Sequence, residues 1–199
     1  MRIFVLRARK GPTLPDYVEA NLGQHNHLEV IAQTIIAAFY VAKDLRDDVI
    51  LHIVCEGPPE PPKIITLDSR PGFPLSGFDE GSTIAFLKQA LARSAAMERH
   101  EIRCLGPGLQ ISRKSFENLA RELSATHPTF ILDKKGTDIR QSQLSGDACF
   151  LLTDHIPMQK KTGHLLRRLG VKKLSLGPRM VFAAHCVAIT HNELDRRHM

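Results

Sequence analysis

The stretch that decides the fold runs from Leu174 to Arg197 and reads LSLGPRMVFAAHCVAITHNELDRR. It begins as a short apolar strand and turns at Gly177 and Pro178. A helix with one apolar face and a charged tail is predicted to follow, from about Met180 to Leu194. A glycine hinge, a thiol and a basic end lie close together here, which suits either a small cofactor or a polyanion.

The segments before this stretch alternate between predicted strands and helices. Short apolar runs predict strands at residues 2–8, 49–55, 63–67, 101–105, 129–132, 148–153 and 173–176. Helical spacing of apolar residues predicts helices at residues 27–45, 82–97, 112–125 and 159–169. This alternation predicts an α/β fold with a mainly parallel sheet and helices on both faces. We see no confident linker, so we expect one domain over residues 1–199.

Bulk composition favours an ordinary globular protein. The chain has 199 residues, of which 43% are hydrophobic, and it contains no uninterrupted apolar run of about 18 residues. The N-terminal apolar run is too short for a signal peptide, so we expect a cytoplasmic protein with no membrane partner. The four cysteines are far apart and form no C-x-x-C pair, so neither a disulfide framework nor a metal site is predicted.

The positive charge gathers in the last third of the chain. Residues 130–199 contain 12 Lys and Arg against six Asp and Glu, whereas residues 1–129 contain 15 of each. Clustered cations favour a phosphate-bearing partner over no partner at all, although a solvated basic surface is the alternative. The chain has 6% aromatic residues and no tryptophan, so we expect folded RNA read by shape and phosphates, not a stacking platform for single strands.

Several familiar nucleotide and hydrolase motifs are missing from the sequence. It contains no G-x-G-x-x-G after a strand, no P-loop and no G-x-S-x-G nucleophile elbow. Ligands of open α/β sheets bind beyond the carboxyl ends of the strands. The strand ends that are candidates for ligand binding are therefore FILDKKG, FLLTDHIP and LSLGPRM.

Four segments carry a resemblance to a known family: FILDKKG, SGDACFLLTDHIP, KKLSLGP and HCVAITHNELDRR. They resemble the archaeal tRNA pseudouridine N1-methyltransferases and their bacterial relatives, a branch of the SPOUT methyltransferase superfamily. The resemblance implies an S-adenosylmethionine-dependent enzyme that methylates N1 of a pseudouridine in tRNA or another structured RNA. It also implies a homodimer and a C-terminal trefoil knot that binds the cofactor, although knots are rare enough that physical reasoning alone argues against one.

The resemblance implies a cofactor site made of loops that follow the strands. Without a Cβ, Gly177 would let the backbone approach a planar base, and Cys186 would form a small apolar wall. The family's Gly-Asp-His-Ile-Gly run here begins with Thr153 and ends with Pro157, which brings a side chain to that turn. The matching cofactor-binding positions are Leu132, Thr153, Ser175, Leu176, Gly177, Pro178, Met180 and Cys186.

The chemistry requires a group that accepts the N1 proton and cations that hold the RNA. Asp154 is the candidate catalytic residue, either accepting that proton or orienting the base, while a helix cap is the alternative role. Arg167, Arg168, Lys172 and Lys173 are the candidate RNA-binding residues.

Two other functional classes remain open from the sequence. A non-catalytic RNA-binding protein of the same fold would use the same basic surface. A cysteine hydrolase would combine Cys186 with His185 or His191, but neighbours one and five residues apart on a helix are poorly arranged for a triad.

Overall fold

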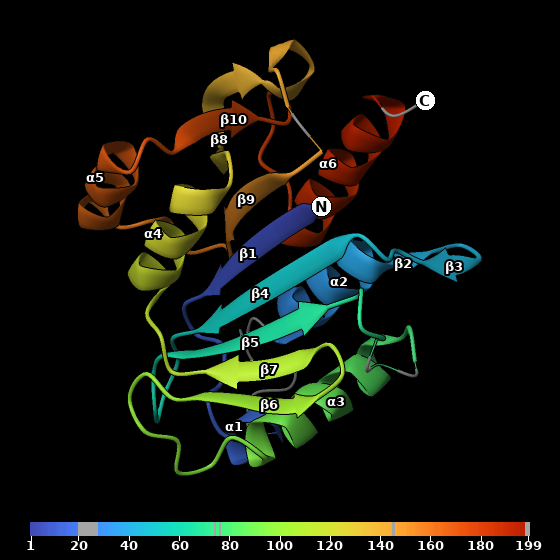
Figure 1. The fold of residues 1–199 in the computed structure, drawn as a ribbon, viewed down its shortest axis with the longest axis vertical. Helices are drawn as coiled ribbons and strands as arrows, with labels where there is room; N and C mark the ends of the chain where they lie inside the picture. Colours follow the sequence, from blue (N-terminus) through green and yellow to red (C-terminus); the bar gives the residue numbers. More distant parts are fainter. Residues whose placement is uncertain (20–27, 74, 76, 145, 198–199) are drawn as a thin grey trace.

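The computed structural model describes residues 1–19, 28–73, 75, 77–144 and 146–197, and within them one eight-stranded sheet forms the centre (Figure 1). The strand order is β10-β8-β9-β1-β4-β5-β7-β6. A separate hairpin pairs β2 with β3. The strands are β1 (Arg2–Ala8), β2 (Tyr40–Val41), β3 (Asp44–Leu45), β4 (Val49–Cys55), β5 (Lys63–Asp68), β6 (Ile102–Gly106), β7 (Leu109–Ser112), β8 (Thr129–Asp138), β9 (Ala148–Thr153) and β10 (Lys172–Ser175).

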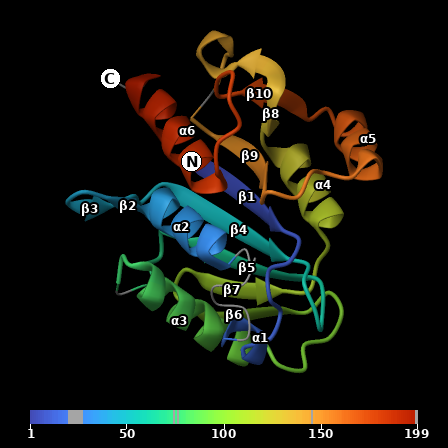
Figure 2. The ribbon, with the colours of Figure 1, turned by 180° about the vertical axis from the view of Figure 1, so that it is seen from behind.

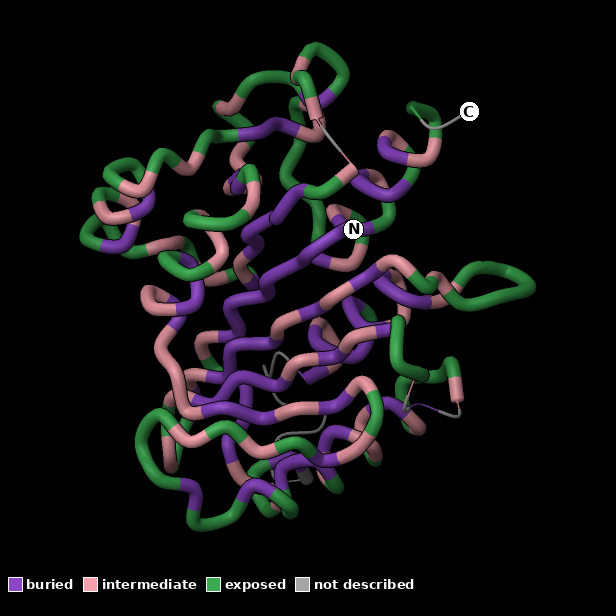
Figure 3. Tube along the Cα trace, in the orientation of Figure 1, coloured by how far each residue is buried: buried purple, intermediate pink, exposed green. Residues whose placement is uncertain are grey.

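Helices cover both faces of the sheet, as predicted (Figures 1 and 2). One face carries α1 (Asp16–Glu19), α2 (Leu28–Phe39), α3 (Glu80–Ala92) and α6 (Ala183–Arg197). The other carries α4 (Phe116–Thr126) and α5 (Lys160–Arg168), and a short 3₁₀ turn spans Ile139–Gln141. Each face has its own apolar core, and β1 between them is buried along its whole length (Figure 3). No helix of the described residues has both the length and the apolar character to cross a membrane.

The sheet is parallel at one end and antiparallel at the other. The pairings β10–β8, β8–β9, β9–β1 and β1–β4 are parallel. The pairings β4–β5, β5–β7 and β7–β6 are antiparallel. Short connections cause this change, because residues 56–62 and the turn at Pro107 and Gly108 leave no room for a crossover helix. The mainly parallel sheet is thus confirmed, with an antiparallel edge.

Two predicted helix boundaries are wrong because strands lie beside them. The predicted helix at 27–45 includes His27, which lies outside the described residues, and α2 ends at Phe39, where the β2–β3 hairpin begins. Ser112 is not a cap but the last residue of β7, which the sequence analysis missed. Ser115 caps α4 instead, and its side chain accepts from the Asn118 N–H at 3.2 Å.

The other helices shift by a few residues. The N-cap of α3 is Asp79, not residue 81 or 82, and the helix ends at Ala92, five residues before the predicted end at 97. The last helix begins at Ala183, three residues after the predicted Met180. Residues 178–182 are exposed instead, which lengthens the turn between β10 and α6.

Candidate active site

The candidate site lies where β8, β9 and β1 reach their carboxyl ends, because parallel strands bring these ends to one edge of the sheet. Thr153, the half-buried last residue of β9, pairs with Arg7 near the end of β1. One residue further, the Asp154 N–H donates to the Arg7 carbonyl at 3.1 Å. The turn after β9 is therefore fastened to β1 at an edge where ligands bind in open α/β sheets.

Asp154 is buried, and its carboxylate accepts two backbone hydrogen bonds. Oδ2 accepts from the Arg9 N–H at 2.8 Å, and Oδ1 accepts from the Ile156 N–H at 2.9 Å. The alternative that Asp154 caps the next helix is wrong, because the N-cap of α5 is Gln159. Asp154 instead fixes the turn that follows β9, and a carboxylate can accept more bonds than these two.

Gly136 marks the place where β10 passes closest to the chain of β8. Lys173 pairs with Ile131, but the next residue, Leu174, pairs with Thr137, so the register shifts and residues 132–136 of β8 bulge out of the pairing with β10. A Cβ on Gly136 would lie 2.5 Å from the Leu174 nitrogen and 2.6 Å from the Lys173 carbonyl carbon. Both atoms belong to the backbone and cannot turn aside as a side chain could, so the passage requires glycine.

The turn after β10 exposes the backbone of Gly177 on a side where no described atom covers it. The Ser175 hydroxyl accepts from the Gly177 N–H and donates to the Gly177 carbonyl, both at 3.2 Å. Gly177 has φ of +140°, a conformation that other residues rarely adopt. A Cβ at this position would meet no described atom within 4 Å, so a planar ligand has room to approach the backbone.

Three of the predicted cofactor residues lie half-buried against the same core, namely Leu132, Leu176 and Cys186. The Cys186 thiol points to the Val181 carbonyl at 3.7 Å. Burial raises its pKa to about 11, so the thiol stays protonated at neutral pH. A protonated, half-buried thiol fits an apolar wall and argues against the hydrolase alternative.

Pro178 and Met180, also predicted to bind the cofactor, extend into solvent. Met180 is 81% exposed, and it opens an exposed apolar run with Val181 and Phe182, which are 41% and 64% exposed. Five of the predicted cofactor residues, from Ser175 to Met180, therefore belong to the end of β10 and the turn after it, and the described chain leaves the Pro178–Met180 side of this turn uncovered. Leu132, Thr153 and Cys186 lie on β8, β9 and α6.

Basic side chains cover the outer surface of α5 and the start of β10. Five of them are exposed and have no ion-pair partner within the described part of the chain: Lys160, Lys161, Arg167, Arg168 and Lys172. The first turn of α5 holds no acidic residue, and Gln159 makes no side-chain cap. Lysines there oppose the helix dipole, so they suit anion binding better than helix stability. Lys173 differs, because its Nζ lies 2.6 Å from Asp133 Oδ2.

A buried arginine that was not predicted from the sequence ties α4 and α5 to the sheet. Arg7 Nε donates to both Glu56 carboxylate oxygens at 3.0 Å, and Nη2 lies 3.2 Å from Glu117 Oε1. Arg7 Nη1 donates to Thr162 Oγ1 at 3.2 Å, and the guanidinium lies over the Phe116 ring at 4.5 Å. The basic helix α5 therefore has a fixed position beside the turn of Asp154. Only the unusual arginine inside an apolar strand could have signalled this contact.

A second missed cluster fastens α6 to β1. Arg2 Nη1 lies 2.9 Å from His191 Nδ1, while His191 Nε2 lies 3.0 Å from the Ala38 carbonyl. Because Arg2 can only donate, Nδ1 accepts and Nε2 carries the proton. Arg2 and Arg46 also pair with Asp195, at 2.6 and 2.7 Å. The four-residue spacing of His191 and Asp195 on one helix face was the available signal.

Burial and the two arginines keep His191 neutral. Its pKa falls to about 3, first because burial disfavours the charged ring and then because Arg46 and Arg2 repel a proton. Hydrogen bonds from Arg46 are the largest cause that lowers the Asp195 pKa to about 2. His191 therefore holds α6 in place and cannot serve Cys186 as a base.

Comparisons with known proteins extend over the whole chain. A family model described as "Putative SAM-dependent RNA methyltransferase" matches residues 1–199. A protein of Photobacterium profundum, named "Putative pseudouridine methyltransferase", is 44% identical over 195 residues, which cover 98% of both chains. A Vibrio campbellii protein of the same name is 43% identical over 197 residues, covering 99% of both.

A solved structure shares the fold. The crystal structure of Archaeoglobus fulgidus Nep1 bound to S-adenosylhomocysteine superimposes with a TM-score of 0.64. The superposition covers 100% of this chain and 98% of the Nep1 chain, at 13% sequence identity. At that identity the match establishes the fold and leaves the roles of single residues to the geometry described above.

Proposed function

The chain belongs to the family of S-adenosylmethionine-dependent RNA methyltransferases, and we propose that it methylates N1 of a pseudouridine in a structured RNA, with tRNA as the first candidate. The names of the curated relatives support pseudouridine as the target. The observation that carries the proposal is the bare turn at Gly177, which Ser175 holds open beside the carboxyl edge of the sheet. The basic surface of α5 supports an RNA substrate.

The residues around this turn fit an adenosyl group. Gly177 offers backbone groups without a side chain, and there is free space where its Cβ would be. Leu132, Leu176 and Cys186 offer half-buried apolar walls. In this proposal the rim of the same site is formed by Thr153, Ser175, Pro178 and Met180.

The bound cofactor would supply a sulfonium methyl group that is transferred by in-line displacement. The chain's own residues then have to orient the nucleobase and remove a proton. Pseudouridine is joined to its ribose through carbon, so N1 carries a hydrogen that must leave as the N1–methyl bond forms. We propose that Asp154 accepts this proton. Its carboxylate is held at the edge of the sheet by the N–H groups of Arg9 and Ile156.

The RNA backbone would lie on α5, which connects the two loops of the site. Residues 154–159 precede this helix and β10 follows it, so the chain leads from the turn of Asp154 through α5 and β10 to the proposed cofactor turn. Arg167, Arg168 and Lys172 form no ion pair with the described residues, so they can pair with phosphates. Lys173 would first have to release Asp133, so we expect a smaller contribution from it.

Two further properties belong to the same proposal. The close passage of β10 at Gly136 supports a knotted chain. The exposed run of Met180, Val181 and Phe182 supports a second copy of the chain covering the turn as a homodimer.

Methyl transfer to two matched RNAs tests the function. An RNA with pseudouridine at one position should gain a methyl group, detected by mass spectrometry of its nucleosides. The same RNA with uridine should not, because N1 of uridine is bonded to ribose. Methylation of both RNAs at the same rate would contradict the pseudouridine assignment. RNA binding without S-adenosylmethionine binding would favour the non-catalytic alternative.

A glycine pair tests the cofactor turn by calorimetry with S-adenosylmethionine. Gly177→Ala should weaken binding by at least tenfold, because its methyl group enters the space assigned to the adenosine. Gly170→Ala is the matched control, since Gly170, which follows α5, also has positive φ, +76°, and its Cβ also meets no described atom within 4 Å. Equal affinity in the two variants would remove Gly177 from the site.

A further inference from the structure

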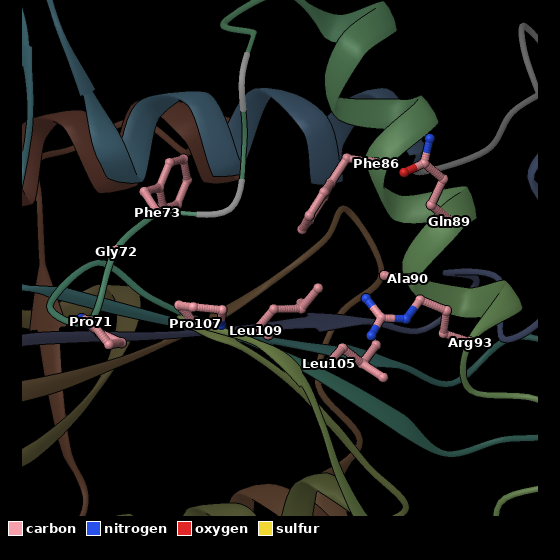
Figure 4. A pocket seen from close by; sticks show the side chains of 11 residues that line it. Pro71, Gly72, Phe73, Phe86, Gln89, Ala90, Arg93, Leu105, Pro107 and Leu109 are labelled. Carbon is pink, nitrogen blue, oxygen red and sulfur yellow. The ribbon is translucent and has the colours of Figure 1, made fainter.

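A hollow of about 500 Å³ lies at the antiparallel end of the sheet, away from the candidate active site (Figure 4). It is bounded by α3, by the turn between β6 and β7, and by the segment after β5. Its volume falls in the range of small-molecule sites. The lining residues on which the argument rests are Phe73, Phe86, Ala90, Arg93, Leu105 and Leu109.

The walls of the hollow are apolar and fixed by packing. Ala90, Leu105 and Leu109 are buried, with 2%, 7% and 6% of their surface exposed. The Phe73 ring packs on Phe39 with centroids 4.3 Å apart. Because these walls are already packed against the core, a flat apolar group could bind on them without moving it.

One cation faces these walls. Figure 4 shows the Arg93 side chain extending from the end of α3 toward Leu105 and Leu109. Its guanidinium has no hydrogen bond or ion pair with any described residue. The neighbouring Arg103 is already engaged, with Glu101 at 2.7 Å and with the Arg93 carbonyl at 2.9 Å. Arg93 is thus the group left to meet an anion at the mouth of the hollow.

We propose that the hollow binds a nucleotide, with its base on the Phe86 and leucine walls and its phosphate on Arg93. A flat apolar surface beside one planar cation matches a planar ring that carries an anionic group. The exposed amide of Gln89 stands on the same helix one turn before Arg93 and can bond to a base edge. The nucleotide can belong to an RNA or be free, and the inference does not depend on the proposed methyl transfer.

A fluorescent nucleotide tests the site directly. The probe is 2-aminopurine ribonucleoside 5′-monophosphate, whose emission changes on stacking and is measured without interference because the chain has no tryptophan. Wild-type protein should bind it saturably. Arg93→Gln should weaken binding at least tenfold, yet leave the unphosphorylated riboside unchanged. Phe86→Leu should weaken both ligands.

Arg99→Gln is the matched control, because Arg99 is exposed on the loop beyond α3 and does not line the hollow. Unfolding curves should show that all three variants keep the wild-type fold. If Arg93→Gln binds the monophosphate as well as Arg99→Gln does, the proposal is overturned. Lack of saturation with wild-type protein would overturn it as well.

Competition with RNA identifies the source of the nucleotide. If RNA displaces the probe and Arg93→Gln weakens RNA binding, the site receives a nucleotide of the RNA. If RNA leaves the probe in place, the site receives a free nucleotide, and the proposal stands in either case. Probe binding without methyl transfer would count against the proposed function alone, and methyl transfer without probe binding against this inference alone.

Discussion

The two ends of the central sheet differ in the connections between their strands and in the groups that these connections expose. At the parallel end, β10 passes in contact with β8, the turn at Gly177 exposes its backbone, and α5 carries exposed cations that form no ion pair with the described residues. At the antiparallel end, short connections join β4 to β5 and β6 to β7, and the surface offers an apolar hollow beside the Arg93 guanidinium, which pairs with no described residue. Residues 1–129 have no net charge, and all of the formal charge of +6 lies in the rest of the chain. The comparison teaches that strand direction, through loop length, decides where a polyanion site can be built.

The largest expected effect comes from blocking the close passage at the parallel end. Gly136→Ala places a methyl group against the backbone of Lys173 and Leu174, so β10 must move away from β8. We expect a loss of about 3 kcal/mol in the free energy of unfolding. Thermal or denaturant unfolding followed by circular dichroism measures it.

Gly163→Ala is the control for this change. Gly163 lies in α5, and a Cβ there would meet nothing within 4 Å. Alanine should therefore stabilise the helix by about 0.5–1 kcal/mol. Equal unfolding midpoints for the two alanine variants would mean that β10 does not pass β8 as described.

The next effect concerns the contact of α6 with β1 and its dependence on pH. The His191 pKa of about 3 lies below its ordinary value near 6.5. Between these two values the unfolded chain binds a proton at His191 and the folded protein does not. The contribution of neutral His191 is complete above pH 6.5 and is lost as the pH falls toward 3. Unfolding free energies measured across this range should therefore decrease steadily.

His191→Gln should flatten the stability curve between pH 6.5 and 3, while His164→Gln should keep the wild-type slope. His164 is the control because it is exposed on α5. Asp195, with a pKa of about 2, adds a loss that begins only below pH 4. A wild-type slope in His191→Gln would show that another group controls acid unfolding.

A smaller effect compares how the cations at the two ends of the sheet contribute to RNA affinity. The double variant Arg167→Gln/Arg168→Gln should reduce the slope of log affinity for RNA against log salt by about 2, because two phosphate contacts are lost. Lys43→Gln/Arg99→Gln removes two exposed cations far from α5 and should leave the slope unchanged. Equal slopes for the two double variants would place the RNA elsewhere.

The smallest effect concerns two cysteines, one at each end. Cys104 on β6 is exposed, whereas burial raises the pKa of Cys186 to about 11. At pH 7 iodoacetamide should therefore modify Cys104 first, as peptide mass spectrometry would detect. Cys186→Ser should retain methyl transfer, with cofactor affinity reduced a few-fold. Loss of transfer in this variant alone would revive a chemical role for the thiol.

Strands with continuous apolar sequence could be predicted to the residue. β1 and β4 agree with their predicted bounds because both lie inside the sheet, where sequence and burial coincide. β7 could not be found, because Leu109–Ser112 is short and Ser112 also suits a helix cap. The helix through residue 45 was overextended because the spacing of apolar residues continues into a hairpin.

The candidate site was predictable where a local motif carries it, and not where distant residues meet. The resemblance to the SPOUT methyltransferases is confirmed, and the SLGP motif forms a turn with a positive φ at Gly177. The Asp154 carboxylate is fixed by the N–H of Arg9, 145 residues away in the chain. The Arg2–His191 contact spans 189 residues. Sequence spacing contains no information about such pairs.

The contact of α6 with β1 also determines when, during synthesis, the last helix can pack on the sheet. Arg2 is translated 189 residues before its partner His191, and Asp195 follows His191. Because contacts of such long separation form slowly, the first strand has to remain soluble while its neighbours are still being translated. A nascent chain halted before residue 191 would therefore lack the contacts of His191 and Asp195 that hold the last helix on β1, and its exposed apolar surface would favour aggregation.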